Sequence, residues 1–291
     1  MEKSMKTIQP FTLLIKSRKS FDIPQDMLSA IRLHARMLPM YMPKKWGWYE
    51  SSEYPFNPEH IDTMVCDNGT TDDVWWKRTG KNRARGAFTT WSRFSPVQQH
   101  STIDIEFYDT KYQTELLDYL KAATLLSMGD FSLLDGVATE YFEFAKASHL
   151  VVGYARFDLK DTWRIFLPSH HLFHWLPDMP WAGVFGLSYV KLFGKEKLLA
   201  TPAFKVEEIG EDMVFIQLTE KMEDIHLQYE EVMQARYKAK AHLGREHFFN
   251  LEQGYSLEVA DFTSGYAKQQ EAINAKAGKV FTVPSFAFFL P

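Results

Sequence analysis

One stretch, in which a strand pattern is followed closely by a helix pattern, constrains the fold more than any other part of the sequence. Apolar and charged side chains alternate over residues 101–108, which predicts a strand with one buried face. Residues 112–128 carry leucines at helical spacing, which predicts an amphipathic helix that stops at Gly129. Because each element has an apolar face that must be covered, we expect helices and strands to share a core.

The same two patterns recur along the rest of the chain, except that the Pro-, Asn- and Gly-containing residues 43–73 predict a loop. Further strands are predicted at residues 12–16, 73–77, 87–91, 163–167, 203–208 and 213–218. Further helices are predicted at residues 23–38, 187–193 and 229–243. The expected fold class is therefore α+β, with an antiparallel β-sheet of a meander and hairpins and with packed amphipathic helices.

A chain of 291 residues can bury one large core or two modest ones. No linker rich in Pro, Gly and Ser divides it, so we expect a single α+β domain over residues 1–291. Within that domain we expect two lobes, an N-terminal lobe over residues 1–150 and a C-terminal lobe over residues 151–291.

Charge and cysteine content restrict the partners and the compartment. The net charge of -4 does not favour bulk attraction to nucleic acid or to anionic lipid. With Cys66 as its one cysteine, the chain can form neither an internal disulfide nor a cysteine-based metal cluster. The apolar residues 11–15 are too few for a signal-peptide core, and no apolar run is long enough to span a membrane. We therefore expect a cytoplasmic protein with no membrane partner.

A cluster of histidines is the strongest candidate in the sequence for a metal-binding or catalytic site. If the segment were helical, His170 and His174 would share one face at a spacing known from zinc ligands, with His171 beside them. The glutamate of the metalloprotease motif is absent, however, and Pro168 and Pro177 leave little room for a helix. A metal-dependent hydrolase is one interpretation, and an aromatic–histidine segment at a core edge or groove is the other.

The stretch 77–85 concentrates positive charge between two predicted strands. Together with Trp75, Trp76 and Trp91 it suggests a platform for single-stranded nucleic acid, since rings stack on bases and cations follow phosphates. The alternatives are a solvated hairpin tip, whose charges discourage edge pairing, and a contact surface for an acidic partner. The near-neutral chain favours the solvated tip.

Motifs for a nucleophile, a phosphate loop or a dinucleotide site do not occur in the sequence. The acidic pairs Glu207–Glu208 and Glu223–Asp224 fit solvated faces better than a carboxylate site. We therefore expect no catalysis by this chain and no cofactor.

The aromatic share of the sequence, 15%, is high and suggests a partner-binding surface. Because interface hot spots favour Trp, Tyr and Arg, the predicted contact residues can be named. They are Trp46, Trp48, Tyr49, Trp75, Trp76, Arg78 and Trp175. Gly186, Gly194 and Gly244 are predicted to be structural, at places where the backbone turns or packs closely.

Residues 179–244 combine Trp181, the pair Phe185-Gly186, a helix ending at Gly194, a strand pair and a helix ending at Gly244. This pattern resembles immunity proteins of bacterial toxin systems, namely the immunity protein fifty-two family and related type VI secretion immunity proteins. The resemblance implies a protein that protects its producer by binding a cognate toxin and covering its active site. Such a protein needs no chemistry of its own.

Overall fold

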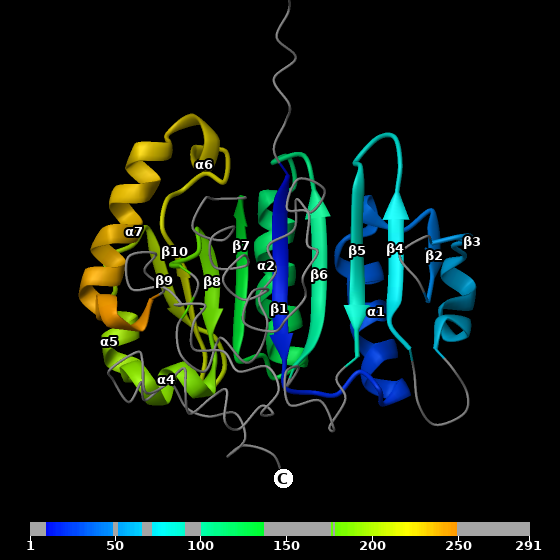
Figure 1. The fold of residues 1–291 in the computed structure, drawn as a ribbon, viewed down its shortest axis with the longest axis horizontal. Helices are drawn as coiled ribbons and strands as arrows, with labels where there is room; N and C mark the ends of the chain where they lie inside the picture. The colour runs from blue at the N-terminus through cyan, green and yellow to red at the C-terminus, as the bar shows by residue number, and fades with distance from the viewer. Residues whose placement is uncertain are drawn as a thin grey trace, which may run out of the picture.

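The computed structural model describes residues 10–48, 52–65, 72–90, 100–136, 176 and 178–248. These residues form a ten-stranded sheet in the order β3-β2-β4-β5-β6-β1-β7-β8-β10-β9, with antiparallel pairing between neighbours (Figure 1). The strands are β1 (Phe11–Ser17), β2 (Lys45–Gly47), β3 (Tyr54–Pro55), β4 (Val74–Arg78), β5 (Ala84–Thr89), β6 (Ser101–Phe107), β7 (Phe131–Gly136), β8 (Ala182–Phe185), β9 (Lys205–Glu208) and β10 (Val214–Gln217).

The helices of the described residues lie around this sheet. They are α1 (Pro24–Met37), α2 (Gln113–Leu126), α4 (Leu187–Phe193), α5 (Lys195–Leu199), α6 (Asp224–Leu227) and α7 (Tyr229–Leu243), with the short 3-10 helices η1 (Pro39–Tyr41), η2 (Pro58–Met64) and η4 (Arg245–His247). Pro24 begins α1, where its missing N–H costs nothing, and Pro39 follows the end of that helix. No helix in these described ranges is both long and apolar enough to cross a membrane.

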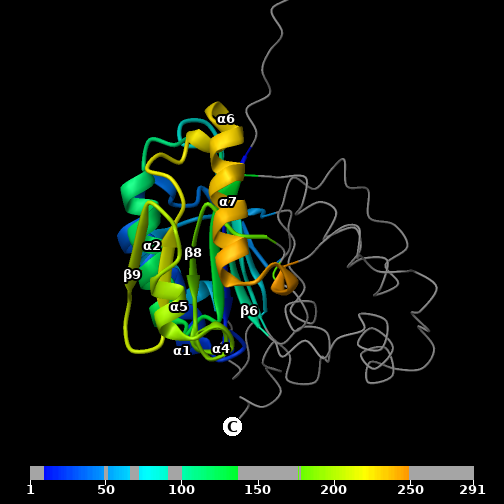
Figure 2. The same ribbon diagram turned by 90° about the vertical axis from the view of Figure 1, so that its left-hand side faces the viewer.

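Two apolar cores lie on the two faces of the sheet. Successive side chains of a strand point to opposite faces, so neighbouring residues of one strand belong to different cores. Leu13 and Ile15 of β1 belong to the larger core, which α1 and α2 cover. Leu14, between them, belongs to the second core, which α4, α5 and α7 cover near β8 and β10. The edge-on view shows α1 and α2 on the same side of the sheet (Figure 2). All seven residues of β1 are buried because the strand is enclosed on both faces.

The predicted α+β class and antiparallel pairing are confirmed. The helices at 187–193 and 229–243 have the predicted bounds, whereas the strand expected at 87–91 is β5, Ala84–Thr89. Residues 101–107 form the predicted strand, but both of its faces are largely buried, and Glu106 is fully enclosed. The expected strand at 163–167 lies outside the described residues.

One prediction about the chain's irregular parts needs correction, and two strands lie where none was expected. The loop expected at 43–73 contains β2, β3 and η2. Strands β7 and β8 were not predicted, because neither shows the alternation of a half-exposed strand. Through the pairing of β7 with β8, one sheet includes strands from both halves of the chain.

Candidate partner-binding surface

Three aromatic rings gather at the β3 edge of the sheet. The ring centroids of Trp46 and Trp48 lie 5.3 Å apart, those of Trp46 and Tyr54 5.5 Å, and those of Trp48 and Tyr54 5.6 Å. Beside them the surface forms an open depression of about 390 Å³, which we call the aromatic pocket. It is lined by Trp46, Trp48, Tyr54, Pro55, Asn57, His60 and Thr63.

Strand pairing brings these rings together. Trp46 faces Tyr54 across the β2–β3 pair and Trp76 across the β2–β4 pair, so the three side chains share one face of the sheet. The other wall of the aromatic pocket is η2, whose first turn is capped by Asn57 Oδ1 accepting from the Glu59 N–H at 3.0 Å.

The aromatic pocket combines a buried base with an exposed rim. Trp46 is only 7% exposed, whereas Tyr54 is 49% exposed and Asn57 and His60 are also exposed. Trp48 is half-buried, and its indole Nε1 has no hydrogen-bond partner in the part of the chain that the structure describes. The depression therefore offers ring surface, chiefly that of Tyr54, to a binding partner, whereas the Trp48 N–H is closed off from solvent.

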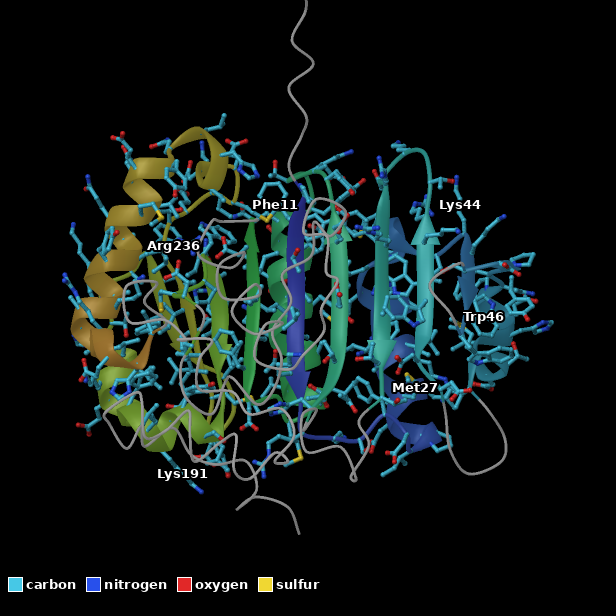
Figure 3. The ribbon with its side chains drawn as sticks, in the orientation of Figure 1. Phe11, Met27, Lys44, Trp46, Lys191 and Arg236 are labelled. Atoms are coloured by element: carbon cyan, nitrogen blue, oxygen red, sulfur yellow. The ribbon has the colours of Figure 1, made fainter. Side chains whose placement is uncertain are left out.

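Positive charge collects at the end of the sheet next to the aromatic pocket. We call this group the basic end; its members are Lys44, Lys45, Arg78, Lys81, Arg83 and Lys111. Lys45 pairs with Pro55 of the aromatic pocket, and the Phe56 N–H donates to the Lys44 carbonyl at 3.1 Å, so the two features are continuous. Figure 3 shows Lys44 and Trp46 on the same side edge of the molecule.

None of these six cations pairs with a carboxylate among the described residues. Arg83 lies over the Tyr108 ring at 4.6 Å and Lys111 over the Tyr112 ring at 5.1 Å. Arg78 donates from Nη1 to the Met42 carbonyl at 3.0 Å. Ring faces and backbone carbonyls, rather than ion pairs, therefore hold Arg78, Arg83 and Lys111 in the basic end.

The predicted contact residues fall into different environments. Trp46 and Trp48 line the aromatic pocket, and Arg78 belongs to the basic end. Trp76 is 1% exposed and packs against His34 at 4.9 Å, so the prediction that its ring contacts a partner is wrong: the core needs this side chain. Trp75 alternates to the opposite face of the sheet and is half-buried there. Sequence reasoning overlooked Tyr54, which lies in the segment expected to be a loop.

Several other predicted sites lie outside the described residues. They are Tyr49, Cys66, Trp91, His170, His171, His174 and Trp175. In the described ranges, no three His, Cys, Asp or Glu side chains gather as a metal-binding group. The alternative of a histidine metal site is therefore untested.

The three glycines predicted to be structural have identifiable roles. Gly194 and Gly244 have φ values of 85° and 111°, a region that side chains with a Cβ rarely adopt. Gly186 is needed for another reason, because a Cβ there would lie 2.1 Å from the Gly129 carbonyl oxygen.

A buried charge cluster, not predicted from the sequence, joins α7 to the sheet. Arg236 donates from Nη2 to both carboxylate oxygens of Asp135 at 2.7 and 2.8 Å, and from Nη1 to Asp178 at 3.1 Å. Lys240 donates to Asp178 at 2.8 Å. Because the guanidinium and both carboxylates are almost fully enclosed, this cluster fixes α7 and presents nothing to solvent.

Ser188, Asp130 and His100 form a second buried cluster of residue types found in hydrolases. Ser188 Oγ donates to Asp130 Oδ1 at 2.7 Å, and His100 Nε2 lies 3.2 Å from Asp130 Oδ2. The carboxylate stands between the other two groups, whereas a catalytic triad needs the histidine in the middle. Burial lowers the pKa of His100, and the cluster ties β7 to the start of α4.

Comparison with known proteins adds a loose structural likeness. No family model matches the sequence, and a search of curated proteins gave no match. A solved structure described as a T6SS protein of Pseudomonas aeruginosa matches with a TM-score of 0.49 and 10% identity, over 92% of this chain and 81% of that one. At this TM-score we infer no function from the likeness.

Proposed function

We propose that this chain is an immunity protein that binds a cognate bacterial toxin and occludes its active site, with the aromatic pocket as the contact region. The observation that carries the proposal is the trio Trp46, Trp48 and Tyr54, whose rings pack in edge-to-face and tilted contacts at the edge of the sheet, with half of Tyr54 exposed. Clustered aromatic side chains with a buried base and an open rim are typical of interface hot spots.

The sequence resemblance to type VI secretion immunity proteins supports the same proposal. The elements that carry it occur in the expected order, with β8, α4, the β9–β10 hairpin and α7 between Trp181 and Gly244. Binding by occlusion needs a rigid surface and no reactive group. The aromatic pocket meets the first requirement, because η2 is capped and its Asp62 pairs with Arg32 of α1.

Co-expression with the product of the neighbouring gene tests the proposal. We expect the two proteins to co-purify and the chain to protect cells against that product. Replacing Tyr54 by Ala should weaken the complex about 30-fold, which corresponds to a hot spot of about 2 kcal/mol.

Tyr237→Ala is the matched control, because Tyr237 of α7 is 54% exposed, similar to Tyr54, but lies on another element. Its affinity should equal that of the unmodified chain. A neighbouring product without toxicity, or a complex equally sensitive to both substitutions, would contradict the proposal. The metal-dependent hydrolase is a separate prediction, and it requires stoichiometric bound zinc that is lost when His170 and His174 are replaced by Ala.

A further inference from the structure

The basic end gathers positive charge in one place, although the chain as a whole has a net charge of -4. The Lys44 Nζ lies only 3.6 Å from the position that a Cβ on Gly80 would take, directly over the β4–β5 turn. Arg78 reaches the same turn, where its Nε donates to the Lys81 carbonyl at 3.2 Å. Clustering unpaired cations costs free energy through their mutual repulsion.

The turn that carries these cations is rigid. Gly80 and Asn82 adopt φ values of 84° and 55°, and the Asn82 side chain donates to the Met40 carbonyl at 3.2 Å. The Lys44 N–H donates to the Lys77 carbonyl at 3.0 Å and so holds β2 against the turn. The backbone positions that carry these cations are therefore set before a partner arrives, which reduces the backbone entropy lost on binding.

We infer that the basic end binds a carboxylate-rich surface of the partner protein, while the aromatic pocket takes an apolar side chain beside it. This inference rests on the proposed function, because it names the chemistry of the surface that the chain would cover. Lys44, Lys45 and Lys81 are exposed and have no ion pair with described residues, so each can gain a carboxylate partner. Charges at the rim of an interface mainly raise the association rate and make it depend on salt.

The structure favours an acidic protein over single-stranded nucleic acid. Base stacking along a strand needs several free ring faces, but Trp76 is buried and the Tyr108 and Tyr112 rings are already covered by Arg83 and Lys111. The exposed ring of the aromatic pocket is that of Tyr54, and one such ring suits a single side chain better than a run of bases.

A probe that does not need the toxin tests the inference on the full chain. Binding of a fluorescent poly-L-glutamate peptide is measured by anisotropy, with an oligothymidylate of equal length as the second probe. We expect the peptide to bind and to weaken at least about 10-fold between about 50 and 300 mM NaCl. The substitutions Lys44→Glu, Lys45→Glu and Lys81→Glu together should abolish the binding.

The matched control carries Lys221→Glu, Lys238→Glu and Arg245→Glu, which change the net charge equally at exposed positions on other elements. It should bind the peptide as the unmodified chain does. The inference is overturned if the peptide does not bind the unmodified chain, if both triple variants lose peptide binding equally, or if oligothymidylate binds more tightly than the peptide. If Tyr54→Ala weakens the complex with the neighbouring gene product but the charge substitutions do not, this inference alone is overturned. If the chain forms no complex with that product, the proposed function is overturned.

Discussion

Acid should destabilise this protein through His34, which lies in the core between α1 and the sheet. His34 is 2% exposed and is surrounded by Trp76, Tyr119 and Phe88 at ring distances of 4.9, 5.7 and 6.0 Å. Neither of its ring nitrogens is paired with another side chain in the described part of the chain, and the Tyr41 backbone offsets only a little of the effect of burial on its pKa. Burial lowers the pKa of His34 from its ordinary value of 6.5 to about 4.

The sign and size of the effect follow from these two pKa values. In the unfolded chain His34 takes up a proton below pH 6.5, whereas the folded protein resists protonation down to about pH 4. The stability that the neutral ring provides is therefore complete above pH 6.5 and is lost as the pH falls through this window. At about 1.4 kcal/mol per pH unit, the loss of unfolding free energy at pH 4 is about 3 kcal/mol.

Urea unfolding of the unmodified chain and of His34→Leu, at several pH values between 7.5 and 4, measures this loss. Carboxylates and the buried His100 titrate in both proteins, so the difference between the two curves isolates His34. The difference should grow in favour of His34→Leu by about 3 kcal/mol on acidification. If the unfolding free energies of the two proteins change in parallel between pH 7.5 and 4, the assignment of His34 as a buried, neutral group is refuted.

Two stability experiments test other parts of the fold. Arg236→Leu leaves the enclosed carboxylates of Asp135 and Asp178 without their guanidinium, so it should lower the unfolding free energy by about 3–5 kcal/mol in urea titrations. The same measurement on Gly194→Ala should show a loss of about 1–3 kcal/mol from backbone strain alone, because Gly194 has φ 85° and ψ 135° and nothing lies within 4 Å of the added Cβ. Gly186→Ala should cost clearly more, because its Cβ would meet a backbone oxygen at 2.1 Å; equal losses at the two glycines would contradict this reasoning.

The elements that could be predicted from the sequence are those with strong periodicity. The helix α7 buries Val232, Arg236, Ala239 and Leu243 at helical spacing, and its bounds were predicted. Strand β7 has no such signal, because all six of its residues are buried. The short strand β2 forms through pairing with distant β4, and β3 forms through pairing with β2, which local sequence does not specify.

The candidate site was predictable only in part. Two adjacent tryptophans on a strand must point to opposite faces, but the sequence does not show which of Trp75 and Trp76 enters the core. The register decides it, because Gly86 opposite Trp76 leaves room for the indole ring. Tyr54 gave no local signal. The Asp135–Arg236 pair joins residues far apart in the chain, so spacing could not reveal it.

The position of β1 at the centre of the sheet determines the order in which this protein can complete its fold. During synthesis both edges of β1 stay open until β6 and then β7 have been made (Figure 1). Nascent chains that end before Gly136 therefore carry a largely apolar strand with an unpaired edge that has to be shielded. Deletion of Phe11–Ser17 would separate β6 from β7 and divide the sheet in two, so this protein does not tolerate trimming from its N-terminal side past Phe11.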